Sequence, residues 1–135
     1  LMSPGCCDPL YRKAIRTSIA TTLQIPYAVV EDWPAGLESV RRHGYELVAL
    51  TPDADAVCLN SFEFFKAGHG TGLILGNEGD GLSAPILEVA DARVRIPLEP
   101  VVDSLNVATT AAIVLCHLSQ LGERLGAGNN SQDGR

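Results

Sequence analysis

The sequence is poor in the side chains that nucleic-acid-binding surfaces usually contain. Aromatic residues make up 5% of its 135 residues, and ten Lys and Arg face sixteen Asp and Glu, which gives a formal net charge of −6. Because contacts with phosphates require a basic face, this balance argues against a free-standing nucleic-acid-binding protein. Seven of the ten basic residues form three clusters: Arg12, Lys13 and Arg16; Arg41 and Arg42; Arg93 and Arg95. Each cluster is expected either to contact nucleic acid locally or to lie on a solvated helix face or strand end.

The sequence also lacks long hydrophobic runs and metal-ligand spacings. No apolar segment is long enough to cross a bilayer, and no signal-peptide pattern opens the chain. Adjacent Cys6 and Cys7, with Cys58 and Cys116 far away, suggest neither a disulfide framework nor a metal site. These absences predict a protein of the reducing cytoplasm with no membrane span and no metal. The chain starts at Leu1 rather than Met, so we expect a fragment or a chain trimmed after synthesis.

What the sequence does contain is enough apolar material, 46%, for one globular domain with a buried core. The predicted strands cover residues 27–30, 46–50, 71–75 and 92–96, and the predicted helices cover 9–23, 33–43, 83–89 and 105–121. This alternation predicts an α/β fold, a mostly parallel sheet with helices on both faces. We expect the domain to occupy residues 1–125 and a disordered tail, poor in apolar groups, to occupy residues 126–135.

The most distinctive segment follows the third predicted strand. Residues 75–83 read Leu-Gly-Asn-Glu-Gly-Asp-Gly-Leu-Ser, with three glycines and two carboxylates but no Lys or Arg. A strand–glycine loop–helix connection usually brings bare backbone close to a ligand. The G-x-x-G-x-G spacing is not the Rossmann G-x-G-x-x-G, and the carboxylates of Glu78 and Asp80 would repel a diphosphate. The loop therefore favours a neutral or cationic ligand, although taken alone it also fits an acidic surface turn.

Two later segments, residues 96–97 (Ile-Pro) and 104–107 (Ser-Leu-Asn-Val), accompany this loop. In order and spacing the three segments resemble the second and third motifs of the SpoU/TrmH-type RNA ribose 2′-O-methyltransferases of the SPOUT superfamily. The resemblance covers roughly residues 5–121. It implies a deep trefoil knot at the C-terminal end of the fold, which the order of strands and helices by itself does not indicate.

The resemblance also implies S-adenosyl-L-methionine as the cofactor and an RNA, tRNA or rRNA, as the substrate. It implies cofactor contacts, mainly through backbone atoms, at Gly76, Ile96 and Leu105, with Thr51 at the preceding strand end as a further candidate. Periodicity alone would instead assign Ile96 and Leu105 to the core. An apolar slot with nearby carboxylates and carbonyl oxygens would suit both an adenine and a sulfonium cation.

Two polar residues, Glu78 and Asn106, match active-site positions of the family. The resemblance implies that they fix the loop and orient the substrate or a missing partner. Hydrogen bonding within the loop and at a helix cap is the alternative for both, and Ser104 is a candidate cap of the last helix.

The family activates the ribose hydroxyl through an Arg in its first motif, and nothing in this sequence matches that motif. We therefore expect a methyltransferase domain that carries the cofactor half of the site without the activating half. The alternative is a non-catalytic cofactor-binding or assembly module that keeps the knotted fold. A nucleotide-phosphate binder is a third hypothesis, which the acidic loop disfavours. The resemblance implies a homodimer, and the Ala-rich segment 105–121 is compatible with one.

Overall fold

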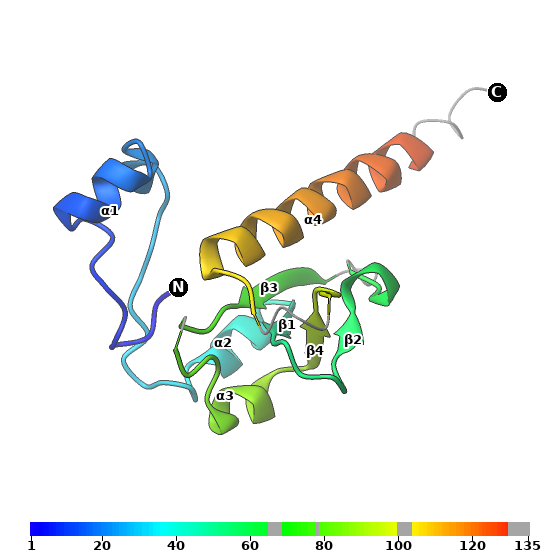
Figure 1. Ribbon diagram of the computed structural model, residues 1–135, viewed down its shortest axis with the longest axis horizontal. Coiled ribbons are helices and arrows are strands. Elements are labelled where there is room, and N and C mark those ends of the chain that lie inside the picture. The colour runs from blue at the N-terminus through cyan, green and yellow to red at the C-terminus, as the bar shows by residue number, and fades with distance from the viewer. Residues whose placement is uncertain (65–68, 78, 100–103, 130–135) are drawn as a thin grey trace. The chain divides into compact units, whose positions relative to one another are not determined.

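The computed structural model describes residues 1–64, 69–77, 79–99 and 104–129. The chain forms two compact units, residues 1–43 and residues 44–135. In Figure 1 the first unit runs from blue to cyan, and the second continues through green to red. The predicted alternation of strands and helices is found in the second unit, whereas the first consists mostly of turns and short helices.

The first unit contains the helices α1 (Arg12–Thr17) and α2 (Leu37–Arg42) and the 3-10 helix η1 (Thr21–Leu23). Residues 27–30, predicted as a strand, form only an isolated parallel bridge between Val29 and Met2. In that bridge the N–H of Met2 donates to the carbonyl of Ala28 at 2.9 Å, and the N–H of Val30 donates to the carbonyl of Met2 at 2.9 Å. Among this unit's described residues, Leu37 alone is buried, so the unit has almost no core of its own.

The prediction of one helix over residues 9–23 is wrong. The Asp8 carboxylate accepts a hydrogen bond from the N–H of Leu10 at 2.8 Å, but α1 begins only after Tyr11. It ends after Thr17 because Ile19 and Ala20 adopt left-handed conformations, with φ of 51° and 63°. Two successive non-glycine residues in that region end the α-helical hydrogen bonding, and η1 follows as a separate element.

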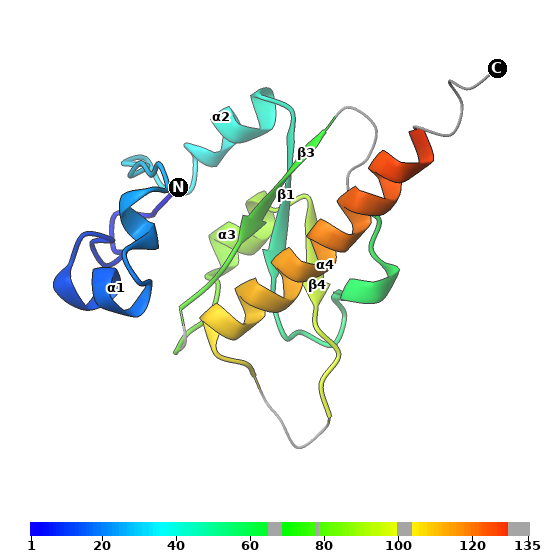
Figure 2. The same ribbon diagram turned by 90° about the horizontal axis from the view of Figure 1, so that it is seen from above.

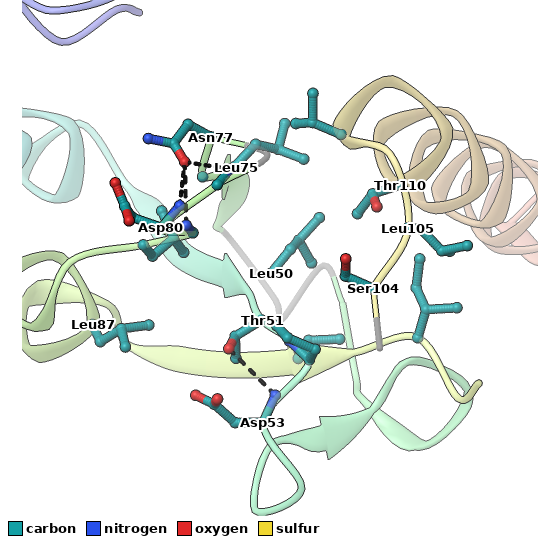
Figure 3. A pocket seen from close by; sticks show the side chains of 18 of the residues that line it. Leu50, Thr51, Asp53, Leu75, Asn77, Asp80, Leu87, Ser104, Leu105 and Thr110 are labelled. Atoms are coloured by element: carbon teal, nitrogen blue, oxygen red, sulfur yellow. Dashed lines mark hydrogen bonds between the residues drawn. The ribbon is translucent and has the colours of Figure 1, made fainter. Parts of the chain in front are cut away.

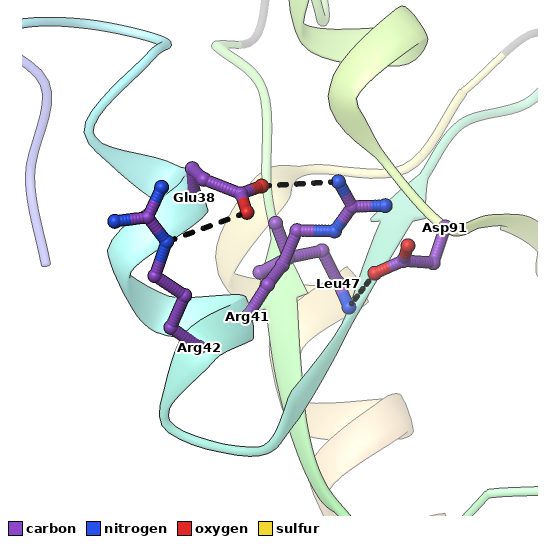
Figure 4. A network of polar contacts seen from close by, with 5 residues as sticks. All are labelled: Glu38, Arg41, Arg42, Leu47 and Asp91. Atoms are coloured by element: carbon purple, nitrogen blue, oxygen red, sulfur yellow. Dashed lines mark hydrogen bonds and ion pairs between the residues drawn. The ribbon is translucent and has the colours of Figure 1, made fainter.

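The helix α2 starts later than predicted but ends where expected. Its last turn is followed by Gly44 with a φ of 80°, the left-handed conformation in which glycine commonly terminates a helix. On its surface the Glu38 carboxylate pairs with Arg41 at 3.2 Å and with Arg42 at 3.7 Å (Figure 4). These pairs at i, i+3 and i, i+4 spacing support the helix modestly.

The second unit contains a parallel sheet, as predicted, although one of its four strands, β2, lies outside the predicted strands. Its elements are β1 (Tyr45–Leu50), β2 (Val57–Cys58), the 3-10 helix η2 (Leu59–Ser61), β3 (Gly70–Ile74), α3 (Ala84–Val89), β4 (Ala92–Arg95) and α4 (Val107–Asn129). The strand order is β2-β4-β1-β3, and each neighbouring pair is parallel. In register, Val48 of the central strand β1 lies opposite Leu73 of β3 and Ala92 of β4.

Helices cover both faces of this sheet, with α4 on one side and α3 on the other (Figures 1 and 2). The core under α4 consists of buried apolar side chains from several elements: Val48, Leu50, Leu59, Phe64, Val94 and Val114. Leu47 and Ala49 alternate with Val48 and Leu50 along β1 and are buried too, on the face where α3 contributes Ile86. A fold with both sheet faces covered explains why residues 47–50 of the central strand β1 are apolar throughout rather than alternating.

The boundaries of the helix α3 agree with the prediction, whereas the end of the helix α4 does not. Ser83 precedes the first turn of α3, with Pro85 inside that turn, as predicted for residues 83–89. The last helix continues to Asn129, eight residues beyond its predicted end at Leu121. Residues 126–129, expected in a disordered tail, are therefore helical, and residues 130–135 lie outside the described part of the chain.

Backbone and side-chain hydrogen bonds join the beginnings of β1 and β4. The N–H of Leu47 donates to the carboxylate of Asp91 at 2.8 Å (Figure 4), and the N–H of Asp91 donates to the carbonyl of Leu47 at 2.8 Å. This pair of hydrogen bonds aligns β1 and β4 before their ladder begins, which brings their carboxyl ends to the same edge.

No helix in the described part of the chain is both long and apolar enough to cross a membrane.

Candidate functional site

Segments that follow the ends of three parallel strands line one pocket of about 290 Å³ (Figure 3). Thr51 follows β1, Gly76 follows β3 and Ile96 follows β4, while Leu105 lies just before α4. Since β4, β1 and β3 are parallel neighbours, their carboxyl ends share one edge of the sheet, where ligands bind in open α/β folds. The four residues predicted near the cofactor therefore do line a single pocket.

The first wall of the pocket is the glycine loop, and Asn77 organises it. The Asn77 side-chain oxygen accepts hydrogen bonds from the N–H groups of Gly79 at 2.9 Å, Asp80 at 2.7 Å and Gly81 at 3.3 Å. An antiparallel bridge between Asn77 and Gly81 closes the loop. One side chain thus holds three consecutive backbone donors, an arrangement that Asn adopts readily in turns.

Close backbone packing explains the first glycine of this loop. A Cβ atom on Gly76 would overlap the carbonyl carbon of Gly81 and would lie 2.7 Å from its oxygen and 2.8 Å from the N of Leu82. Gly81 has a φ of 68°, a conformation that L-residues rarely adopt. The loop therefore needs glycine at position 76 for space and at position 81 for its backbone conformation.

The second wall is formed by the segment after β4 and the first turns of α4. Ile96, half-buried, also packs against the core, so it belongs both to the pocket and to the core that periodicity indicated. Figure 3 shows the side chains of Ser104 and Thr110 directed toward the space between Leu50 and Leu105. Neither of these two hydroxyls has a hydrogen-bond partner among the described residues. They are free to bind a polar group of a ligand.

Asn106 caps the helix α4. Its side-chain oxygen accepts hydrogen bonds from the N–H groups of Ala108 at 2.9 Å and Thr109 at 3.3 Å, and its carbonyl accepts one from Thr110 at 2.9 Å. The prediction that Ser104 caps this helix is therefore wrong. Asn106 does not line the pocket itself, but its position fixes the start of α4 against the pocket wall. The other predicted catalytic residue, Glu78, lies outside the described residues.

The chemistry of the lining indicates which ligands the pocket suits. Its walls are largely aliphatic: Leu50, Leu75, Leu82, Leu87, Val94, Ile96, Leu98 and Leu105. Asp53 and Asp80 contribute carboxylates, and no Lys or Arg is among the described residues that line it. An aliphatic slot with negative charge nearby disfavours a diphosphate and suits a planar apolar group joined to a cation.

Three contributors to the pocket escaped the sequence-based reasoning. Asn77 lay within the recognised motif, and the signal that could have identified it is an Asn directly before a run of glycines, where its side chain accepts backbone hydrogen bonds. The hydroxyls of Ser104 and Thr110 carry no comparable local signal, because only the packing of α4 against the strand ends directs them to the pocket.

The SpoU rRNA Methylase family profile matches residues 1–116. The chain belongs to the SpoU rRNA methylase family. Among its relatives, an uncharacterized tRNA/rRNA methyltransferase from Mycobacterium tuberculosis is 41% identical over 124 residues, which cover 92% of this chain and 43% of that protein. The 23S rRNA (guanosine-2′-O-)-methyltransferase RlmB from Xanthomonas campestris pv. campestris is 31% identical over 112 residues, covering 83% of this chain and 43% of that protein.

A solved structure of an rRNA methyltransferase is similar to this chain in fold. The AdoMet-bound rRNA methyltransferase from Sinorhizobium meliloti matches with a TM-score of 0.73 at 27% identity, covering 84% of this chain and 42% of that one. The chain spans less than half the length of each of these three relatives.

Proposed function

We propose that this chain is the cofactor-binding part of an S-adenosyl-L-methionine-dependent RNA ribose 2′-O-methyltransferase acting on tRNA or rRNA. The observation that carries the proposal is the single pocket at the carboxyl edge of the sheet, lined by all three motif segments. The family membership and the 2′-O-methyltransferase named among the relatives support the reaction, and the AdoMet-bound neighbour supports the cofactor.

The lining of the pocket fits this cofactor. Leu50, Ile96 and Leu105 offer apolar surface for an adenine, and Gly76 brings its backbone to the same pocket. The carboxylates of Asp53 and Asp80 favour a sulfonium cation over an anionic nucleotide. When bound, S-adenosyl-L-methionine supplies an electrophilic methyl group, whose transfer to a ribose 2′-oxygen releases the hydroxyl proton.

The residues of the chain itself are assigned to binding and positioning. Gly76, Ile96, Leu105 and Thr51 contact the cofactor in this proposal. Asn106 holds the start of α4 through its cap and, with Glu78, orients the substrate. The group that activates the ribose hydroxyl has no match in this sequence, so we propose that sequence outside the chain supplies it.

We further propose that the segment after β4 and the helix α4 form the trefoil knot of the family and that α4 packs against a second copy. The exposed apolar side chains of α4 support the second point, with Leu115 57% and Ile113 38% exposed. Residues 107–122 include no Asp, Glu, Lys or Arg. Light scattering of the native gene product should report a dimer, and the variant Leu115→Glu should shift it toward the monomer.

The decisive experiment uses the native gene product. Calorimetry should detect S-adenosyl-L-methionine binding, and tRNA or rRNA incubated with labelled cofactor should gain a label at a ribose 2′-oxygen. Binding without transfer to either RNA would favour the second candidate, a non-catalytic cofactor-binding or assembly module. The observation behind that candidate is the absence of any match to the activating Arg motif. No binding at all would remove the methyltransferase and leave an assembly module that does not bind the cofactor.

A further inference from the structure

The two units differ sharply in charge. Residues 1–43 carry five basic and four acidic side chains, whereas residues 44–135 carry five basic and twelve acidic ones. Within the first unit, residues 9–30 include Arg12, Lys13 and Arg16 and no acidic residue. Although the net charge of the whole protein is negative, residues 9–30 therefore carry only positive side-chain charges.

The basic side chains of the other two clusters make contacts within the protein. Arg41 and Arg42 pair with Glu38, and Arg93 pairs with Asp55 at 3.8 Å. The guanidinium of Arg95 donates to the carbonyl of Ala56 at 3.2 Å.

By contrast, the side chains of Arg12, Lys13 and Arg16 make no hydrogen bond or ion pair among the described residues, and all three are exposed. Their charges are thus available to an external partner.

The geometry of α1 gathers these charges on its outer side. Ala14 and Ile15 are half-buried, whereas Arg12 and Arg16 are exposed one helical turn apart. Tyr11, at the start of the helix, is 56% exposed. A cationic helix face flanked by an exposed aromatic ring is the combination that binds an RNA strand, through phosphate contacts and base stacking.

We propose that the outer face of α1, formed by Tyr11, Arg12, Lys13 and Arg16, is an RNA-binding surface. The partner is the phosphodiester backbone of the substrate RNA, so the inference rests on the proposed function. Contacts of this kind carry little sequence information but hold the RNA in place. An acidic methyltransferase domain needs such a local cationic surface, because the rest of its charge repels the substrate.

Two double variants of the native gene product test this surface. Arg12→Gln with Arg16→Gln removes two unpaired charges from α1, and the matched control Arg41→Gln with Arg42→Gln removes two ion-paired charges from the same unit. Fluorescence anisotropy with labelled bulk tRNA and a labelled 23S rRNA transcript, over a series of salt concentrations, gives the affinity and its salt dependence.

We expect the α1 variant to bind both RNAs roughly tenfold more weakly, with a salt-dependence slope reduced by about 1.4 to 1.8, and the control to remain near the wild type. Tyr11→Ala should weaken binding without changing the slope, because stacking releases no counterions. At saturating RNA the α1 variant should methylate at the wild-type rate, with a raised KM. Equal affinity and slope for the α1 variant and the control would overturn the inference.

The outcomes separate this inference from the proposed function. If the wild type transfers no methyl group, the function fails, but the anisotropy comparison still decides whether α1 binds RNA. Circular dichroism and denaturant unfolding, which do not depend on the cofactor, report whether each variant is folded. If the double variant does not fold, the single variants Arg12→Gln and Arg16→Gln decide, each lowering the slope by about one if α1 contacts phosphates and leaving it unchanged otherwise.

Discussion

The backbone at Gly81 occupies the space where a side chain at Gly76 would lie. The carbonyl oxygen of Gly81 lies 2.7 Å from the position that a Cβ on Gly76 would take. The contact closes the glycine loop on itself, and the closed loop forms one wall of the pocket. The stability of the loop and the shape of the pocket therefore depend on the same pair of residues.

Gly76→Ala should destabilise the protein and abolish cofactor binding. The added methyl group meets backbone rather than a flexible side chain, so the loop must open, at a cost of about 1–3 kcal/mol. Calorimetry with S-adenosyl-L-methionine and chemical denaturation measure the two effects. The control is Gly79→Ala, whose Cβ would meet only the Asn77 side chain, at 3.6 Å, and should be tolerated. If both variants bind the cofactor like the wild type, the loop does not form the cofactor site.

Asn77→Ala should loosen the glycine loop without disturbing the sheet. The substitution removes the acceptor of three backbone N–H groups, and we expect cofactor affinity to fall by roughly tenfold, or about 1.4 kcal/mol. Asn77→Asp keeps an acceptor oxygen at this position and should retain most of the affinity. Isothermal titration of both variants makes the comparison. A wild-type affinity for the Ala variant would show that these hydrogen bonds do not shape the pocket.

Asn106 variants can separate its two proposed roles. Asn106→Ala removes the cap of α4 and should lower the free energy of unfolding by about 1 kcal/mol. Asn106→Asp retains the cap and should leave stability near the wild-type value, but it loses the amide N–H donor. We expect methyl transfer by the Asp variant to fall roughly tenfold, the effect of about one hydrogen bond. Full activity with full stability in the Asp variant would reduce Asn106 to a capping residue.

Ala20→Gly should stabilise the first unit. Ala20 has a φ of 63°, where an L-residue costs about 1–2 kcal/mol and glycine does not. After allowing for the greater freedom of glycine in the unfolded chain, we expect a gain of about 0.5–1 kcal/mol. Denaturant unfolding of the native gene product tests this against Ala14→Gly, which lies inside α1 and should destabilise. A loss of stability in Ala20→Gly would contradict the left-handed conformation.

The first unit marks the limit of local sequence reasoning. Asp8 and Pro9 indicate a helix start, and nothing in the following residues indicates that Ile19 and Ala20 leave the helical region, because neither type favours a left-handed conformation. The apolar run at residues 27–30 likewise has the composition of a strand. A strand also needs a neighbour along its length, and within the described residues only Met2 bridges to this run.

The sequence by itself determined the parallel sheet and the identity of the glycine loop. Apolar runs of strand length separated by helical periodicity leave few alternatives to a sheet covered on both faces, and the motif spacing identifies the loop. Only the tertiary structure decided that Thr51, Gly76, Ile96 and Leu105 share a pocket, since they meet only when parallel strands align their carboxyl ends. It also decided which charges remain available at α1, because pairing depends on neighbours in space that a one-dimensional pattern does not contain.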